Sequence, residues 1–296
     1  MAIGLLLGLG AAVMWGLTDV SGSVASRRFG SLRVLAGAHL VGFSFIAILA
    51  FVRGISIPTD PAILVSAVAV GLFGAGAYLA FFTGLRIGPL AVVSPTVAAF
   101  GGLTVVLSVI FLGESLTFLQ AAGALLATIG VVLVGFVSDA GLRATRIVGP
   151  GVLLGVAALI LFALMTVASS GPVRQVGWLE FSLLSRTVNV IAIWGLFIVS
   201  LRSRSPLLAP LLAAGEARSK VGAAAIVAAG LLDILGLVSF TIGLEQADTW
   251  IVGLASSFGP AIAVLVAVSF MRERLRRTQW LGLAVIASGL VAVAVP

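Results

Sequence analysis

The segment FLGESLTFLQ (111–120) has a counterpart in FMRERLRRTQ (270–279), 159 residues further along the chain. At this offset Glu114 aligns with Glu273. The first copy contains no Lys or Arg, whereas the second contains four. Cytoplasmic connections of membrane proteins carry an excess of Lys and Arg. The pair therefore predicts one structural element that occurs twice, on opposite sides of a membrane.

The repeat extends beyond these two segments. Further matches at the offset of 159 pair Gly84-Leu85 with Gly243-Leu244, Leu116 with Leu275, Gly123 with Gly282, Gly130 with Gly289 and Val134 with Val293, while Gly4, Gly8 and Met14-Trp15 match Gly151, Gly155 and Leu161-Phe162 at an offset of 147. We expect two five-helix halves, 1–137 and 148–296, inverted because five is odd. Inverted repeats often enclose a transporter's substrate site. Chance similarity between two glycine- and alanine-rich segments is the competing interpretation.

The composition excludes a soluble protein. Of the 296 residues 61% are hydrophobic and only 9% charged, with a mean hydropathy of +1.28. A typical soluble domain has about 25% charged residues. About 20 apolar residues span a bilayer as a helix. We expect an all-α integral membrane protein of ten helices around a central cavity, with spans near 3–26, 33–52, 62–85, 89–111, 116–137, 148–170, 178–200, 220–244, 248–270 and 278–295.

The basic residues predict the orientation of the chain. Fourteen Lys and Arg fall in the odd-numbered connections, and only Arg53 and Arg174 fall in the even ones. This asymmetry predicts cytoplasmic odd connections, with both termini on the periplasmic side of a bacterial inner membrane. The formal net charge of +7 is thereby explained without a nucleic-acid partner.

At the level of ten helices and two repeats, nearly the whole chain resembles the EamA-type members of the drug/metabolite transporter superfamily. The runs that carry the resemblance are GLRIGPLAVVSP…VIFLGESLTFLQAAGALLATIGVVLVG (84–135) and FTIGL…SSFGPAIAVLVAVSFMRERLRRTQWLGLAVIASGLVAV (240–293), together with Met14-Trp15-Gly16. The family pattern places Pro thirteen residues before Glu-x-Leu, as Pro260 precedes Glu273; in the first half Gly101 stands there, and Pro95 lies six residues earlier. The resemblance implies a metabolite exporter similar to bacterial amino-acid exporters, including those for aromatic amino acids.

Four charged or titratable side chains, Asp19, His39, Arg186 and Asp233, lie well inside the predicted spans, away from the span ends. A charge at the bilayer centre costs at least about 2.5–3.5 kcal/mol, so each needs a partner or a function. Asp19 lines a cavity or pairs with a basic residue at the cytoplasmic mouth. His39 carries a proton or bonds between helices, and Asp233 pairs with Arg186 or His39 or binds a proton. We therefore regard Asp19, His39 and Asp233 as candidates for proton coupling.

Arg186 and several uncharged residues are candidates for substrate binding. Arg186 binds a substrate carboxylate through its planar guanidinium or snorkels outward; Asn189, on the same face, favours the inward position. Tyr78 and Phe81 share a face of the third span that forms an aromatic wall or packs in the core. The predicted substrate contacts are apolar at Trp15, Tyr78, Phe81 and Trp250, and polar at Arg186, Asn189 and Ser257.

Prolines and glutamates near the helix ends have structural roles in this interpretation. Pro95 and Pro260 lack a backbone donor and are expected to kink their helices and take part in gating. Glu114 and Glu273 are expected to cap the next helix or pair with nearby arginines, and not to bind substrate.

These features predict a secondary transporter that exports small amphipathic metabolites, amino acids above all, by alternating access, either as a uniporter or coupled to protons. An intramembrane enzyme acting on lipid or isoprenoid would need two convergent carboxylates or a metal set, and a channel would need a continuous polar lining. The chain has no Cys, HExxH or Walker loop, so we expect no metal and no cofactor. The expected partners are a small molecule and the bilayer; the oligomeric state stays open, with a monomer as the working assumption.

Overall fold

The computed structural model describes residues 1–87, 90–135, 149–202, 220–259, 261–262 and 277–294. Its regular elements are α1 (Ala2–Phe29), α2 (Ser31–Arg53), α3 (Pro61–Ile87), α4 (Leu90–Ala98), α5 (Phe100–Leu112), α6 (Phe118–Gly135), α7 (Pro150–Val176), α8 (Trp178–Arg202), α10 (Lys220–Gln246), α11 (Thr249–Ser256) and α13 (Arg277–Ala294). Over these ranges every element is a helix, which confirms the all-α prediction.

The helices are long and apolar enough for a membrane protein. Eight candidate spans meet the length and hydropathy of a bilayer crossing, and Phe118–Val134 is a shorter apolar helix. Large apolar side chains such as Phe51 and Phe118 are 87% and 90% exposed, as suits a surface that contacts lipid tails. The expected number of ten stays a prediction, because much of the ninth span lies among residues 263–276.

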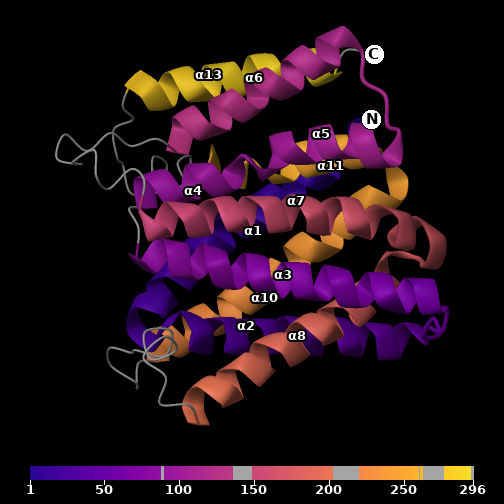
Figure 1. Ribbon diagram of the computed structural model, residues 1–296, viewed down its shortest axis with the longest axis vertical. Coiled ribbons are helices and arrows are strands. Elements are labelled where there is room, and N and C mark those ends of the chain that lie inside the picture. The colour runs from indigo at the N-terminus through magenta and orange to yellow at the C-terminus, as the bar shows by residue number, and fades with distance from the viewer. Residues whose placement is uncertain (88–89, 136–148, 203–219, 260, 263–276, 295–296) are drawn as a thin grey trace.

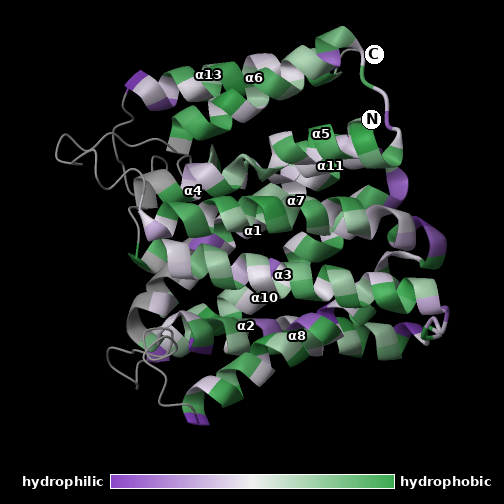
Figure 2. Ribbon diagram, in the orientation of Figure 1, coloured by the Kyte–Doolittle hydropathy of each residue, from purple (hydrophilic) through white to green (hydrophobic). Residues whose placement is uncertain are grey.

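Successive spans cross in alternating directions, so both termini lie at the same end of the bundle (Figure 1). The opposite end holds the C-terminus of α8, at Arg202, and the N-termini of α10 and α13, at Lys220 and Arg277. Hydrophobic residues cover most of the ribbons, and hydrophilic ones gather at helix ends and along α2 and α8 (Figure 2). We call the end with Arg202 and Arg277 the basic end, and the other the terminal end.

The packing follows the predicted inverted repeat. Helix α1 packs against α10, and α7, the repeat counterpart of α1, packs against α3, the counterpart of α10. Helices α6 and α13, which are counterparts of each other, pack together at one edge of the bundle, where α6 also contacts α4 (Figure 1). Each major helix–helix contact therefore joins the two halves of the chain. This arrangement fits a two-repeat membrane fold.

Glycines permit the close approach of α6 and α13. A Cβ added at Gly130 would lie 2.7 Å from the backbone nitrogen of Ile286, and one added at Gly282 would lie 2.7 Å from that of Val134. Real Cβ atoms do not approach other atoms so closely, so both positions exclude any side chain. Small residues let helices approach closely in lipid, where the hydrophobic effect does not drive their association.

The fourth and ninth spans, each of which holds a proline expected to kink it, are interrupted by short turns at residue 99 and at residues 257–258. Helix α4 ends at Ala98 and α5 begins at Phe100. Pro95 lies inside α4, and the backbone N–H of Ala99 donates to the carbonyls of Pro95 and Thr96, each at 3.3 Å. In the second half α11 ends at Ser256, one residue before the repeat counterpart of Ala98. Pro260, the second predicted kink, lies outside the described residues.

Replacing Gly130 with Ala tests the α6–α13 contact. We expect the free energy of unfolding to fall by about 1–3 kcal/mol, because the added methyl group collides with backbone that cannot move away. Reversible denaturation in detergent micelles measures this difference. The matched control is Gly195→Ala, where no atom lies within 4 Å of the new Cβ. Equal stabilities of the two variants would contradict the proposed packing.

Candidate functional site

Four helices bring their polar side chains together in the middle of the bundle. The Nη2 of Arg186, on α8, donates to Oδ2 of Asp233, on α10, at 2.7 Å. The Nη1 of Arg186 lies 2.5 Å from Nδ1 of His39, on α2, and the hydroxyl of Tyr78, on α3, donates to Oδ1 of Asp233 at 2.5 Å. We call these four side chains the buried network. Burying the charges of Arg186 and Asp233 in a low-dielectric interior costs free energy. Their mutual attraction and the two hydrogen bonds with His39 and Tyr78 offset this cost.

The network settles how these residues pair. Arg186 and Asp233 are each 4% exposed and His39 is 2% exposed, so Arg186 points inward and does not snorkel. Asp233 pairs with Arg186, and His39 reaches it only through that guanidinium. A guanidinium has no acceptor, so Nδ1 of His39 accepts this bond. For His39 to carry a proton at Nδ1, the bond to Arg186 would first have to break.

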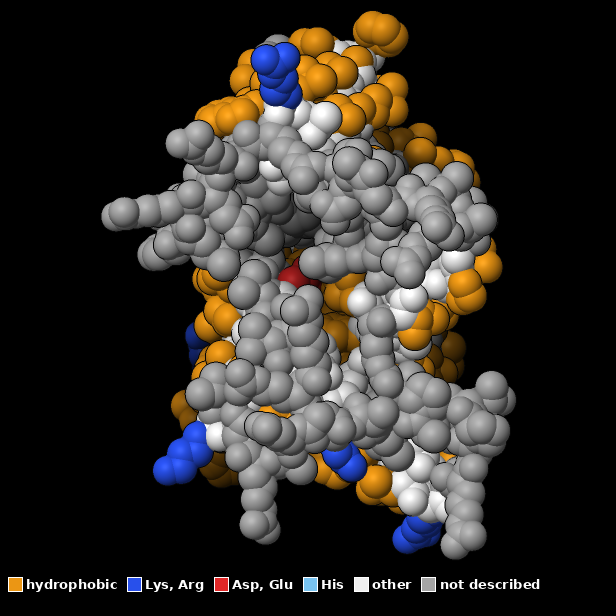
Figure 3. Space-filling view, turned by 90° about the vertical axis from the view of Figure 1, so that its left-hand side faces the viewer, with side chains coloured by type: hydrophobic (Ala, Val, Ile, Leu, Met, Phe, Trp, Pro, Cys, Tyr) orange, Lys and Arg blue, Asp and Glu red, His pale blue; other side chains and the backbone are white. Residues whose placement is uncertain are grey.

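A cavity lies against one side of the buried network, between the two halves of the chain. We call it cavity 1. The volume that the centre of a water-sized sphere can reach in it is about 70 Å³. One water molecule needs about 10–15 Å³ on the same measure, so the cavity has room for several. Its lining is mostly apolar and aromatic: Trp15, Thr18, Asp19, Tyr78, Phe81, Ser94, Val97, Ala98, Phe100, Phe162, Met165, Thr166, Asp233, Ser256, Ser257 and Gly259. Figure 3 shows a hollow with an acidic side chain at its floor in the basic end.

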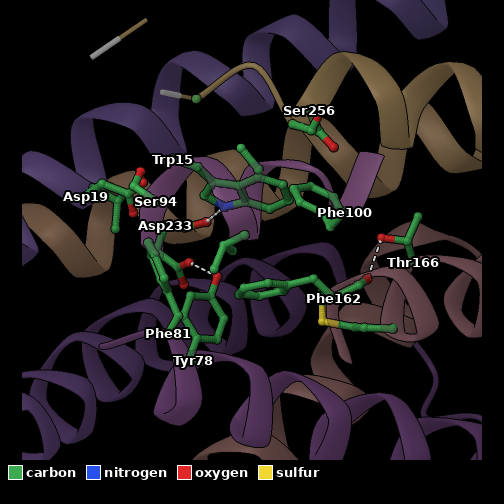
Figure 4. Close-up of a pocket in the computed structure, with 16 residues that line it drawn as sticks. Trp15, Asp19, Tyr78, Phe81, Ser94, Phe100, Phe162, Thr166, Asp233 and Ser256 are labelled. Carbon is green, nitrogen blue, oxygen red and sulfur yellow. Dashed lines mark hydrogen bonds between the residues drawn. The ribbon is translucent and has the colours of Figure 1, made fainter. Parts of the chain in front are cut away.

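Figure 4 shows how the side chains surround cavity 1. The rings of Trp15, Tyr78 and Phe162 face the same space, and Asp19 lies at one edge of it beside Ser94. Trp15 donates from Nε1 to the backbone carbonyl of Asp233 at 3.3 Å. The ring of Tyr78 meets that of Phe162 edge-on, with centroids 5.2 Å apart. Aromatic rings from both halves therefore form the walls.

A second cavity lies on the other side of Trp15, Tyr78 and Met165, which line both spaces. Cavity 2 measures about 40 Å³ and is lined by Arg186 and Asn189. The Nδ2 of Asn189 donates to the carbonyl of Gly71 at 3.3 Å, and its buried Oδ1 has no protein partner among the described residues. Arg186 and Asn189, both predicted substrate ligands, thus face a smaller space than Asp19 does.

Asp19 differs from the other buried acids. Within the described part of the chain its carboxylate makes no hydrogen bond or ion pair, whereas both carboxylate oxygens of Asp233 are engaged. No Lys, Arg or His appears among the described residues that line cavity 1. Among the described residues, nothing compensates a negative charge on Asp19.

The remaining predicted contacts fall in different places. Phe81 and Ser257 line cavity 1. Trp250 is 1% exposed and packs in a core cluster with Leu254 and Phe258. It lines neither cavity 1 nor cavity 2, so its position is that of a core residue.

The repeat offsets identify lining residues that had not been singled out from the sequence. Phe162 and Thr166 are the counterparts, at the offset of 147, of Trp15 and Asp19, and all four line cavity 1. At the offset of 159 the same holds for three further pairs, Val97 with Ser256, Ala98 with Ser257, and Phe100 with Gly259. Cavity 1 therefore lies where the two repeats meet. Met165 carried no such signal, because an apolar residue in an apolar helix looks the same wherever it points.

Glu114 joins the two halves at the terminal end. Its Oε1 and Oε2 accept hydrogen bonds from the backbone N–H groups of Thr249 and Trp250, at 2.8 and 3.0 Å. It also pairs with Arg174 at 3.3 Å, as expected. The helix that it caps is α11, however, and not the next helix α6, because an anionic group is stabilised at any helix N-terminus it reaches. Its counterpart Glu273 lies outside the described residues.

The buried ion pair generates a stability prediction. In Arg186→Met, Asp233 loses its cationic partner, and we expect the free energy of unfolding to fall by about 3–5 kcal/mol. Adding Asp233→Leu removes the stranded carboxylate and should restore much of that loss. Denaturant unfolding in detergent measures both variants, with Arg202→Met, at the exposed C-terminus of α8, as the control. Additive losses in the double variant would show that the pair is not coupled.

The comparisons with known proteins agree with this architecture. No curated protein matches the chain. A solved structure titled only "Crystal structure of protein" is similar over 99% of this chain and 97% of that chain, with a TM-score of 0.79 and 20% sequence identity, a likeness that concerns the fold alone. The EamA-like transporter family matches twice, at residues 2–136 and 149–295. None of these findings names a substrate. The two matches cover almost all of the sequence, so the chain belongs to the EamA-like transporter family, whose members are membrane transporters of the drug/metabolite transporter superfamily.

Proposed function

We propose that this transporter exports small amphipathic metabolites, with amino acids as the first class, by alternating access. The observation that carries the proposal is cavity 1, a space between the two repeats with aromatic rings in its walls and one carboxylate, that of Asp19, which has no partner among the described residues. Ligand sites are mostly apolar, with a few polar groups that fix orientation. Trp15, Tyr78 and Phe81 supply the apolar surface, and Asp19 and Ser257 supply polar atoms.

The size of cavity 1 favours small substrates. Its volume of about 70 Å³ corresponds to about five to seven water molecules at 10–15 Å³ each. We therefore propose for cavity 1 a ligand of similar size, such as one of the smallest amino acids. An aromatic amino acid requires the walls to separate further. We therefore place small amino acids ahead of aromatic ones.

Two features of the fold support alternating access. Glu114, Arg174 and the N-terminus of α11 are bonded together at the terminal end. The hollow seen in Figure 3 opens at the opposite, basic end. In our proposal the terminal end is closed in this conformation, and export requires the contacts of Glu114 to break while the basic end closes.

Proton coupling, where it occurs, centres on Asp19. His39 and Asp233 are held in the buried network, whereas Asp19 faces cavity 1 without a partner among the described residues. A free carboxylate can exchange a proton without breaking other bonds. A uniporter remains the alternative mechanism, and a pH gradient separates the two.

An intramembrane enzyme is less well supported. Asp19 and Asp233 both line cavity 1, but Arg186 and Tyr78 occupy the oxygens of Asp233. In the part of the chain that the structure describes, no three His, Cys, Asp or Glu side chains are grouped to hold a metal. The family assignment also points to transport.

Counterflow in proteoliposomes tests the proposed function. Vesicles that contain the purified protein and unlabelled alanine should accumulate radiolabelled alanine faster than protein-free vesicles, and faster than they accumulate phenylalanine. An imposed pH gradient should drive net transport in the unmodified protein and not in Asp19→Asn, because asparagine cannot bind the proton. No counterflow with any amino acid, or turnover without transport, would refute the proposal. Transport that ignores the pH gradient would make the protein a uniporter.

Thiol labelling tests the closed terminal end. The chain contains no cysteine, so Thr166→Cys places a single thiol in the wall of cavity 1. We expect Glu114→Gln to increase labelling by a membrane-impermeant maleimide from the terminal side, because the neutral amide loses the ion pair to Arg174 and caps α11 less well. Glu245→Gln, which alters an exposed acid at the C-terminus of α10, is the matched control. Unchanged labelling in Glu114→Gln would remove Glu114 from the gate.

A further inference from the structure

We infer that cavity 1 recognises its substrate by a cationic group, a primary ammonium or a similar small organic cation, and that no carboxylate is required. Asp19 supplies the counter-charge and the aromatic rings supply the surrounding surface. The inference rests on the proposed transport function and narrows its substrate class. Amines without a carboxylate should then bind as amino acids do.

The charges around cavity 1 are the first support. Its described lining contains two acids, Asp19 and Asp233, and no Lys, Arg or His. Asp233 is neutralised by Arg186 at 2.7 Å. Of the described lining, Asp19 is therefore the residue whose charge is not balanced by a neighbour, and its carboxylate attracts a cation and repels an anion.

Arg186 is not free to bind a substrate carboxylate. Its Nη2 is bonded to Asp233 and its Nη1 contacts His39, and the side chain is only 4% exposed. It lines cavity 2, with Asn189, and does not line cavity 1. Binding a carboxylate would require it to release Asp233, which would leave a second unpaired acid in the membrane.

The aromatic walls suit a cation equally well. The faces of Trp, Tyr and Phe rings carry partial negative charge and attract cations that lie over them. Trp15, Tyr78, Phe81, Phe100 and Phe162 all line cavity 1. Figure 4 shows Trp15, Tyr78 and Phe162 around the space at whose edge Asp19 lies. An ammonium bound to Asp19 can therefore place its apolar chain among these rings.

The repeat shows that the negative charge is specific to these positions. The counterparts of Asp19 and Asp233 are Thr166 and Gly74, which bear no charge. Symmetry places Asp19 and Thr166 in the wall of the same cavity, so the fold itself does not need an acid there. The acid at position 19 has to be explained by what the cavity binds.

Three probes that share one aliphatic chain test the inference. We expect butylammonium and 2-aminobutyrate to bind the purified protein in lipid nanodiscs, and butyrate not to bind, when each is measured by isothermal titration calorimetry against empty nanodiscs. Butylammonium should also inhibit counterflow of radiolabelled 2-aminobutyrate, and butyrate should not. Binding of butyrate with no binding of butylammonium would overturn the inference.

Variants at position 19 identify the counter-charge. Asp19→Asn should weaken butylammonium binding by about thirtyfold or more, as expected for loss of a close charge partner. Asp19→Glu should restore binding in part, and the control Glu245→Gln should bind as the unmodified protein does. Undiminished binding in Asp19→Asn, with an unchanged melting temperature, would refute the role of Asp19. If Asp19→Asn does not fold, the comparison of the three probes on the unmodified protein decides.

The two assays separate this inference from the proposed function. Butylammonium binding that depends on Asp19, without counterflow of any amino acid, would support the cation site and refute amino-acid transport. Counterflow of 2-aminobutyrate that butyrate inhibits and butylammonium does not would support amino-acid transport and refute the cation site.

Discussion

A bilayer provides no water to solvate a buried charge, and this constraint explains why Arg186 and Asp233 lie where they do. Each would be costly alone in the membrane interior, and together, with His39 and Tyr78 as further partners, they are satisfied. His39 and Tyr78 come from α2 and α3, in the first half, whereas Arg186 and Asp233 come from α8 and α10, in the second. The network therefore fixes the two halves against each other beside the cavity, and any movement of α8 relative to α10 must preserve or exchange these bonds.

Equivalent positions of the two repeats line cavity 1, but the side chains at these positions differ. Trp15 and Phe162 occupy equivalent positions, as do Ala98 and Ser257. An inverted pair of repeats can exchange conformations while the site stays at their interface. The residues at equivalent positions differ, above all Asp19 and Thr166, so one side of cavity 1 is acidic and the other is not. A bound molecule therefore has one preferred orientation.

The sequence predicts the all-α fold, the sidedness of the basic residues and several cavity residues. The hydrophobic pattern, the positions of the charges and the internal repeat can all be recognised within the sequence without knowing which distant residues are in contact. It does not predict the partner of Glu114, because Thr249 is 135 residues away and any helix N-terminus would serve. The shared helical face of Trp250 and Ser257 predicts two ligands, yet Trp250 packs into the core. Helical spacing shows which residues share a face and not how much of that face borders a cavity. The lining role of Met165 follows only from the structure, because an apolar residue in an apolar helix carries no mark of the surface that it lines.

A mostly apolar cavity with one acid that has no partner among the described residues suits a carrier better than a channel or an enzyme. A channel needs a continuous polar path, whereas Trp15, Tyr78 and Met165 separate cavity 1 from cavity 2. An enzyme of the kind considered needs a second free acid or a metal, and Asp233 is occupied.

In a carrier, closing the cavity around an empty site must be unfavourable in free energy. While cavity 1 is open, water can solvate Asp19; when it closes, the charge loses that solvation unless a cation or a proton is bound. Occupancy of Asp19 would thereby favour closure, which links binding at cavity 1 to the movement of the two halves.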